Sequence, residues 1–164
     1  MDASCGGNIL IIICMAQSLS RILLHVIFST KNREPWLDAE IRPRVFAYLA
    51  EIGRDMGCEV FRVGGTADHI HMAIHLTRTL TVADFVKKVK GVSSGWIKDR
   101  GSNYAGFSWQ AGYGAFSLGA SQLVILCSYI DRQEEHHRVK GYKDEYREFL
   151  KKYGVDYDEQ YVWD

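Results

Sequence analysis

Two histidines separated by a single residue are the clearest sign of chemistry in the sequence. They lie in the segment Asp68-His69-Ile70-His71-Met72, which we expect to be part of a strand. Since side chains alternate along a strand, His69 and His71 would share one face, about 7 Å apart, with Ile70 and Met72 on the other. Two imidazoles in this arrangement can share one divalent metal ion. The alternative is a pair of partly exposed strand histidines that bind nothing.

A tyrosine and a glutamine later in the chain form a second candidate. Tyr129 and Gln133 are four residues apart, so on a helix they share a face. The apolar residues that could dock such a helix lie on a neighbouring face: Leu123, Leu126, Cys127 and Ile130. The segment therefore presents a phenol and an amide oxygen together beside a buried stripe. The alternative is an ordinary interfacial tyrosine on an amphipathic helix.

The pattern of apolar residues predicts the elements that position these groups. We expect strands at 22–28, 58–63 and 68–76, strand-like pieces at 107–110 and 115–118, and helices at 38–56, 81–98, 120–137 and 143–153. Thr81, with Asp84 three residues later, resembles a capping box. The order β-α-β-β-α-β predicts an α+β fold, the ferredoxin-like split β-α-β sandwich, with an antiparallel sheet and both crossover helices on one face. A following helix would carry Tyr129. Proteins with this fold have many different functions, so the fold alone does not identify the function.

Composition and charge exclude several classes of protein. The 164 residues are 47% hydrophobic and 24% charged, which is typical of a globular protein and excludes disorder. Twenty basic and twenty acidic residues cancel, which argues against non-specific coating of DNA but allows a local basic face. No apolar run approaches the ~18 residues of a membrane helix. The four cysteines contain no CxxC pair, so we expect free thiols and a cytoplasmic location.

Residues 1–14 differ from the rest of the chain because they contain neither lysine nor arginine. We expect them to be an N-terminal extension outside the core, with Met15 as the natural start and residues 15–164 as a single domain. The alternative is an added edge strand, because residues 9–13 are consecutively apolar and mostly β-branched.

Five segments together resemble a known protein family. They are residues 25–33, 65–71, 107–117, 129–137 and 158–164. In these segments the sequence is similar to the single-tyrosine HUH transposases of the insertion-sequence 200/605 type, which include transposases associated with repetitive extragenic palindromes (REP). The resemblance extends from about residue 19 to residue 164.

This resemblance implies a metal-dependent enzyme that cleaves and rejoins single-stranded DNA at hairpins flanking a mobile element. His69, His71 and, as a third ligand, Gln133 would bind Mg²⁺ or Mn²⁺. Tyr129 would attack the scissile phosphate, release a 3′-hydroxyl and retain a 5′-phosphotyrosine. Because that link conserves the phosphodiester energy, no ATP is needed, and the sequence contains no phosphate-binding G-x-x-x-x-G-K-[ST] loop.

The expected partners are hairpin-forming single-stranded DNA and a second copy of the chain, with no membrane. The candidate phosphate contacts are the basic residues Lys31, Arg33, Lys87, Lys88 and Lys90. The resemblance implies a homodimer with composite sites, in which one chain supplies His69 and His71 and the other supplies Tyr129 and Gln133. The alternative assembly is a monomer with its site complete in one chain.

Two other functions stay open at this point. One is a domesticated or inactive homologue that binds hairpin DNA, or RNA, without strand transfer. The other is a ferredoxin-like RNA-binding or metal-storage module whose histidines are incidental.

Overall fold

Four antiparallel strands form the centre of the computed structural model, which describes residues 18–137 and 141–163. They are β1 (Ile22–Ser29), β2 (Glu59–Gly65), β3 (His69–Leu76) and β4 (Gly114–Ser117), arranged in the order β2-β3-β1-β4. β1 pairs with β3 along its whole length, with Ser29 opposite His69 and Ile22 opposite Leu76. This is the ferredoxin-like sheet that the sequence predicted. The extension expected at residues 1–14 lies outside the described residues.

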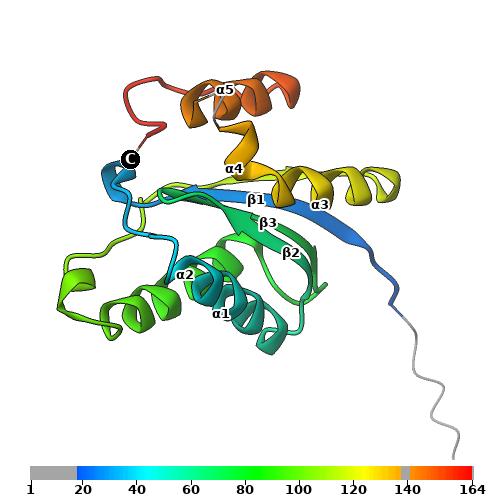
Figure 1. Cartoon of the computed structure of the whole chain (residues 1–164). Coiled ribbons are helices and arrows are strands. Elements are labelled where there is room, and N and C mark those ends of the chain that lie inside the picture. The colour runs from blue at the N-terminus through cyan, green and yellow to red at the C-terminus, as the bar shows by residue number, and fades with distance from the viewer. Residues whose placement is uncertain (1–17, 138–140, 164) are drawn as a thin grey trace, which may run out of the picture.

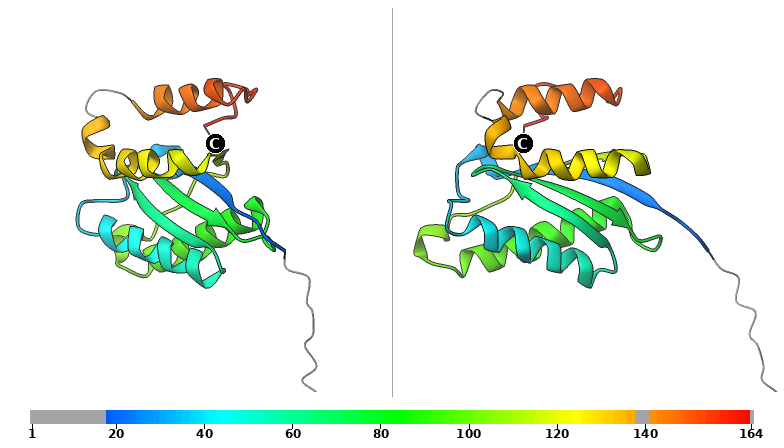
Figure 2. Two further views of the ribbon diagram at one scale, coloured as in Figure 1. Left: turned by 90° about the vertical axis from the view of Figure 1, so that its right-hand side faces the viewer. Right: turned by 45° about the vertical axis from the view of Figure 1, so that its right-hand side comes forward.

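Helices cover both faces of this sheet (Figure 1). α1 (Arg42–Asp55) and α2 (Val82–Lys98) lie on one face, as expected for the two crossover helices. α3 (Leu123–Asp131), α4 (Gln133–His136) and α5 (Tyr142–Lys152) lie on the other face. Both views in Figure 2 keep these three layers apart. Within the described ranges, no helix is both long enough and apolar enough to cross a membrane.

Alternation along the strands gives the sheet two different surfaces. Towards α1 and α2, the main core buries apolar strand residues that include Phe28, Ile70 and Met72. His69 and His71 are also completely buried, but on the opposite face, beneath α3 to α5. The parity argument from the sequence is therefore confirmed, because the two histidines share one face and the intervening apolar residues share the other.

Side-chain caps fix where the crossover helices begin. The Thr81 hydroxyl accepts a hydrogen bond from the backbone N–H of Asp84 at 3.0 Å, as the sequence predicted. Before α1, the Asp38 carboxylate accepts from the backbone N–H groups of Glu40 and Ile41, both at 2.9 Å. Asp38 thus caps a turn that precedes the helix, and α1 itself starts at Arg42 rather than at residue 38.

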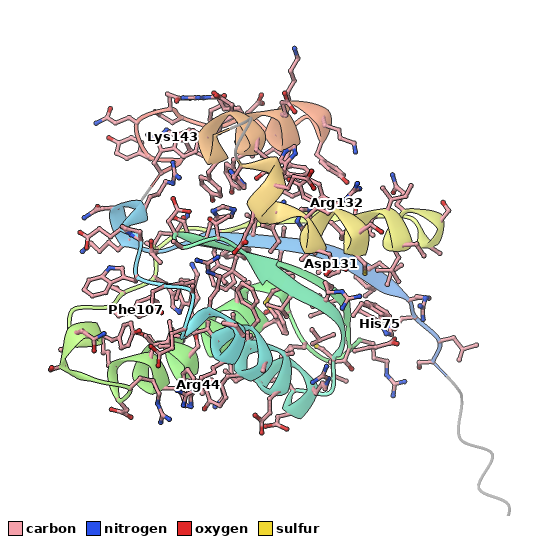
Figure 3. The ribbon with its side chains drawn as sticks, in the orientation of Figure 1. Arg44, His75, Phe107, Asp131, Arg132 and Lys143 are labelled. Atoms are coloured by element: carbon pink, nitrogen blue, oxygen red, sulfur yellow. The ribbon has the colours of Figure 1, made fainter. Side chains whose placement is uncertain are left out.

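The single helix predicted over 120–137 is wrong. Residues 120–122 form a 3₁₀ turn, and Arg132 leaves the helical region with φ −103° and ψ 18°. α3 therefore ends at Asp131 and α4 begins at Gln133. Figure 3 shows Asp131 and Arg132 at this junction. Of the two predicted strand-like pieces, the one at 115–118 corresponds to β4 (Gly114–Ser117), while 107–110 contributes one isolated bridge between Trp109 and Thr30.

Candidate functional site

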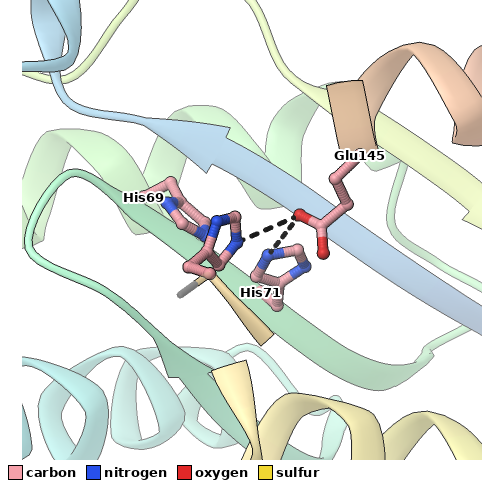
Figure 4. A group of neighbouring side chains, drawn as sticks. His69, His71 and Glu145 are labelled. Atoms are coloured by element: carbon pink, nitrogen blue, oxygen red, sulfur yellow. Dashed lines mark ion pairs between the residues drawn. The ribbon is translucent and has the colours of Figure 1, made fainter. Parts of the chain in front are cut away.

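His69 and His71 form the centre of a buried polar cluster. Their ring centroids are 5.0 Å apart, and both face Glu145 of α5 (Figure 4). Burial, reinforced by neighbouring histidines, holds the pKa of His71 well below its ordinary value, so the ring is neutral at pH 7. Its Nε2 atom is buried and has no hydrogen-bond partner among the described residues. A neutral imidazole with an unused nitrogen is what metal ligation requires.

Each of these two imidazoles is held by a partner on its Nδ1 atom. His69 Nδ1 lies 2.7 Å from the Asp68 carboxylate, to which it can donate. His71 Nδ1 lies 2.9 Å from Nε2 of His25 on β1. Burial and the charge of Lys152 lower the pKa of His25 to about 3, so that ring is neutral and its Nε2 can accept a hydrogen bond from His71 Nδ1–H. Both arrangements leave the Nε2 lone pairs of the cluster free for a cation.

Tyr129 and Gln133 both reach the histidines. Gln133 is almost completely buried, and its Oε1 lies 3.3 Å from His69 Nε2. The Tyr129 ring packs edge-on against His71, with centroids 5.8 Å apart. The Tyr129 hydroxyl is buried and has no hydrogen-bond partner within residues 18–137 and 141–163. The structure thus brings together the four residues that the sequence analysis singled out, and leaves the phenol oxygen available.

Sequence reasoning missed the groups that α4 and α5 add to this cluster. Glu145 Oε2 lies 3.6 Å from His71 Nε2 and 3.4 Å from His137 Nε2. Glu145 Oε1 lies 3.4 Å from His136 Nε2. One carboxylate from α5 therefore faces imidazoles from β3 and from the segment that ends α4.

The environment of Glu145 is unusual for a carboxylate. Burial, with a smaller contribution from the charge of Glu148, raises its pKa to about 8. Glu145 lies among the buried residues of α5, which otherwise are Tyr142, Tyr146 and Leu150. An acidic residue within an apolar helix stripe is the sequence signal that could have revealed it.

The basic residues predicted to contact DNA differ in their exposure and in their contacts with the rest of the protein. Lys31 and Arg33 lie on a 3₁₀ turn (Lys31–Arg33) directly after β1. Lys31 is exposed beside a pocket of about 340 Å³. Arg33 hydrogen-bonds Asp68 and lies over the Tyr142 ring, 4.8 Å from its centroid. Arg33 therefore links the edge of the site to α5.

The three lysines of α2 are also not equivalent. Lys87 and Lys88 are exposed, and α2 lies on the sheet face opposite the histidines. Lys90 is half-buried, and its Nζ donates to the backbone carbonyls of residues 110–112. Burial lowers its pKa to about 8. The Lys90 ammonium thus holds a loop of the protein in place, and a contact with DNA stays a prediction for it.

Comparison with known proteins identifies the family. A family model described as "Transposase IS200 like" matches residues 18–133, from the start of the described chain to Gln133. This chain belongs to the IS200-like transposase family. Membership implies cleavage and transfer of DNA strands. α5 and Glu145 lie beyond the matched range of this IS200-like transposase.

Individual relatives agree with this assignment. The ISDra2 transposase TnpA of Deinococcus radiodurans is 24% identical to this IS200-like transposase over 116 residues, which cover 68% of this chain and 83% of the relative. A crystal structure of a candidate transposase from Deinococcus radiodurans matches with a TM-score of 0.57 and 22% identity, over 73% of this chain and 98% of that one. A REP-associated tyrosine transposase, solved bound to a REP hairpin, matches with a TM-score of 0.54 and 13% identity, over 75% and 74% of the two chains. These likenesses confirm the fold.

Proposed function

We propose that this IS200-like transposase cleaves and rejoins single-stranded DNA at hairpin-flanked element ends, through a 5′-phosphotyrosine on Tyr129. The observation that carries the proposal is the position of the Tyr129 hydroxyl, which lies buried beside His71 with no hydrogen-bond partner in the described part of the chain. A buried phenol normally has such a partner unless its oxygen serves another purpose. Attack on a phosphate beside a metal-ligating pair is such a purpose.

The proposed reaction conserves bond energy. The Tyr129 oxygen forms a bond to phosphorus while the bond from phosphorus to the 3′ oxygen breaks, and the leaving strand takes up a proton as a 3′-hydroxyl. A second 3′-hydroxyl can then attack the phosphotyrosine and displace the phenol, so rejoining needs no ATP. The DNA partner is proposed from the REP-associated relative, which was solved with a REP hairpin.

The donor atoms of the site fit a divalent cation, for which we propose Mg²⁺ or Mn²⁺. Because His69 Nδ1–H donates to the Asp68 carboxylate, His69 Nε2 and Gln133 Oε1 are both acceptors, yet they lie only 3.3 Å apart. Two acceptors at this distance repel each other unless a cation lies near both. His71 Nε2 is a third potential metal-ligand atom in the same cluster. A metal ion held there would polarise the scissile phosphate.

The functional unit is proposed to include the C-terminal helix. Residues 15–164 would act together, because Glu145 of α5 contacts the histidine pair from outside the range that the family model matches. Lys31, Lys87 and Lys88 are exposed and available for phosphate contacts.

We also propose a homodimer with composite sites. α3 leaves Val124 and Ile125 exposed by 74% and 70%, an apolar face suited to a second copy. Exchange of the helix segment between two chains would preserve every contact described for Tyr129, because a domain swap replaces an element by its identical copy. The competing arrangement is the one within a single chain, where Tyr129 lies beside its own His71.

A denaturing gel tests the proposed activity. Protein incubated with labelled single-stranded hairpin DNA and Mn²⁺ should give a covalent protein–DNA band, which excess chelator removes. Tyr129→Phe should abolish the band while native gel shifts show that hairpin binding persists. Tyr153→Phe, a neighbour that lines the same pocket as Tyr129, serves as the matched control and should keep the band. A homologue that only binds hairpins would shift the DNA without any covalent band, contrary to the proposal.

A further inference from the structure

The segment beyond the family match brings two more metal-ligating groups to the histidine pair. The ligand atoms of His69, His71, His137 and Glu145 all lie within 4.8 Å of one another. We propose that His137 and Glu145 are metal ligands in the DNA-free protein, and so add a third imidazole and a carboxylate to the histidine pair. This inference rests on the metal ion that the proposed function places at His69 and His71.

The distances around Glu145 are those of neighbouring ligands. Its Oε2 atom lies 3.6 Å from His71 Nε2 and 3.4 Å from His137 Nε2. Both separations exceed the usual 2.7–3.2 Å of hydrogen bonds to nitrogen. Ligand atoms bound to one ion at about 2.1 Å are separated by about 3.4 Å at the tetrahedral angle. The two histidine–Glu145 separations are therefore those expected for ligands of a shared ion.

Burial of Glu145 also favours a cation beside its carboxylate. Glu145 is only 3% exposed, and a buried carboxylate is costly without a compensating positive charge. The partners that the described residues provide within 3.6 Å are histidines and Gln133. Among these, His71 is fully buried, and its Nε2 has no hydrogen-bond partner in the described chain. A divalent ion would satisfy the carboxylate and that nitrogen together.

α5 holds Glu145 in position before any ion arrives. Tyr142, Tyr146 and Leu150 pack into a small core with Ile27 and Phe116 of the sheet. A ligand carried by a packed helix keeps its geometry better than one on a free tail.

Gln133 supports the Glu145 carboxylate from the side of α4. Its Nε2 lies 3.5 Å from Glu145 Oε1, while its Oε1 faces His69. The amide is thus oriented by two members of the cluster.

The donor set indicates the class of ion. Three imidazole nitrogens and one carboxylate oxygen suit first-row transition ions such as Mn²⁺, whereas Mg²⁺ prefers oxygen ligands and retains water. We therefore expect Mn²⁺ to bind the DNA-free protein more tightly than Mg²⁺ does.

The test measures metal binding without DNA. The full chain is titrated with Mn²⁺, with free Mn²⁺ followed by electron paramagnetic resonance and the metal-induced rise in melting temperature recorded for each variant against its own metal-free value. Glu145→Gln and His137→Ala should each bind Mn²⁺ about tenfold or more weakly, since even partners that only support metal ligands cost that much. Asp144→Asn changes an exposed carboxylate on the same helix and should bind like wild type.

The variant His71→Ala tests the histidine pair separately from His137 and Glu145. His71→Ala should lose Mn²⁺ binding if the histidine pair holds the ion. If His71→Ala loses binding while Glu145→Gln and His137→Ala bind like wild type, the role of the C-terminal ligands is refuted and the proposed histidine site stands. If His71→Ala itself binds like wild type, the metal site of the proposed function is wrong. Measuring each shift from the variant's own metal-free value removes effects on folding stability alone.

Discussion

Asp68 fixes the tautomer of His69, the residue that follows it in the chain. Its carboxylate lies 2.7 Å from His69 Nδ1 and also hydrogen-bonds Arg33. Burial alone would raise the pKa of Asp68, but its hydrogen bond with His69 and the charge of Arg33 outweigh burial and hold it well below its ordinary value. The carboxylate is therefore ionised at neutral pH and fixes the proton of His69 on Nδ1.

Asp68→Asn should weaken the metal site without removing a ligand. The amide still accepts a hydrogen bond but lacks the charge that fixes the tautomer, so Mn²⁺ affinity should fall about 10- to 100-fold. DNA cleavage should recover in part at saturating Mn²⁺. Asp131→Asn, a half-exposed carboxylate that pairs with Arg62, is the matched control. Unchanged Mn²⁺ affinity in Asp68→Asn would show that Asp68 does not support the metal site.

Local spacing predicted some residues of the site and could not predict others. Strand parity placed His69 and His71 on one face. Helical spacing paired Tyr129 with Gln133, although the helix breaks at Arg132 between them. His25 reaches His71 only through the pairing of β1 with β3, a long-range register that local sequence does not encode. Glu145 enters through the packing of a separate helix, for the same reason.

At the scale of elements, one glycine sets how closely α3 approaches the sheet. A Cβ atom on Gly64 of β2 would lie 2.6 Å from Ile130 Cγ2 and 2.9 Å from the Ile130 carbonyl oxygen. Ile130 directly follows Tyr129 on α3. The absence of a side chain at Gly64 therefore lets α3 lie near enough to the sheet for Tyr129 to contact the histidines.

Gly64→Ala should push α3 away from the sheet. We expect a loss of about 1–3 kcal/mol in the free energy of unfolding from overpacking, and slower DNA cleavage because Tyr129 is displaced. Gly91→Ala on α2 is the matched control, since a Cβ there meets no atom within 4 Å. It should stabilise the protein by about 0.5–1 kcal/mol. Urea denaturation and cleavage rates provide the measurements, and a Gly64→Ala protein equal to wild type in both would contradict this role.

The pattern of apolar residues in the sequence was sufficient to predict the sheet and the two crossover helices. The break at Arg132 was not predictable, because residues 120–137 contain no proline or glycine that would interrupt a helix. The interruption coincides with burial of Gln133 against His69, which is a tertiary contact. Tertiary packing here overrides local helix propensity.

At the scale of the whole molecule, the two faces of the sheet carry different groups. One face holds the main apolar core, and the other holds the histidine cluster beneath α3 to α5. His69, His71 and the Tyr129 hydroxyl are buried, so we expect a covering helix to shift when the proposed DNA substrate binds.

A mixing experiment tests the assembly. His71→Ala and Tyr129→Phe chains, each inactive alone, are combined under conditions where subunit exchange is demonstrated. Composite sites should restore DNA cleavage, because one site of the heterodimer then contains both defects and the other contains none. If every site is built within one chain, each carries a defect and the mixture stays inactive, which would exclude the composite arrangement.

The most direct test of the account is to locate the DNA on the protein. After reaction with hairpin DNA and Mn²⁺, nuclease and protease digestion followed by mass spectrometry identifies the modified residue and the end of the nucleotide that is attached. We predict a 5′-linked nucleotide on Tyr129. A nucleotide on another tyrosine, such as Tyr142 or Tyr146, or attachment through a 3′ phosphate, would contradict it.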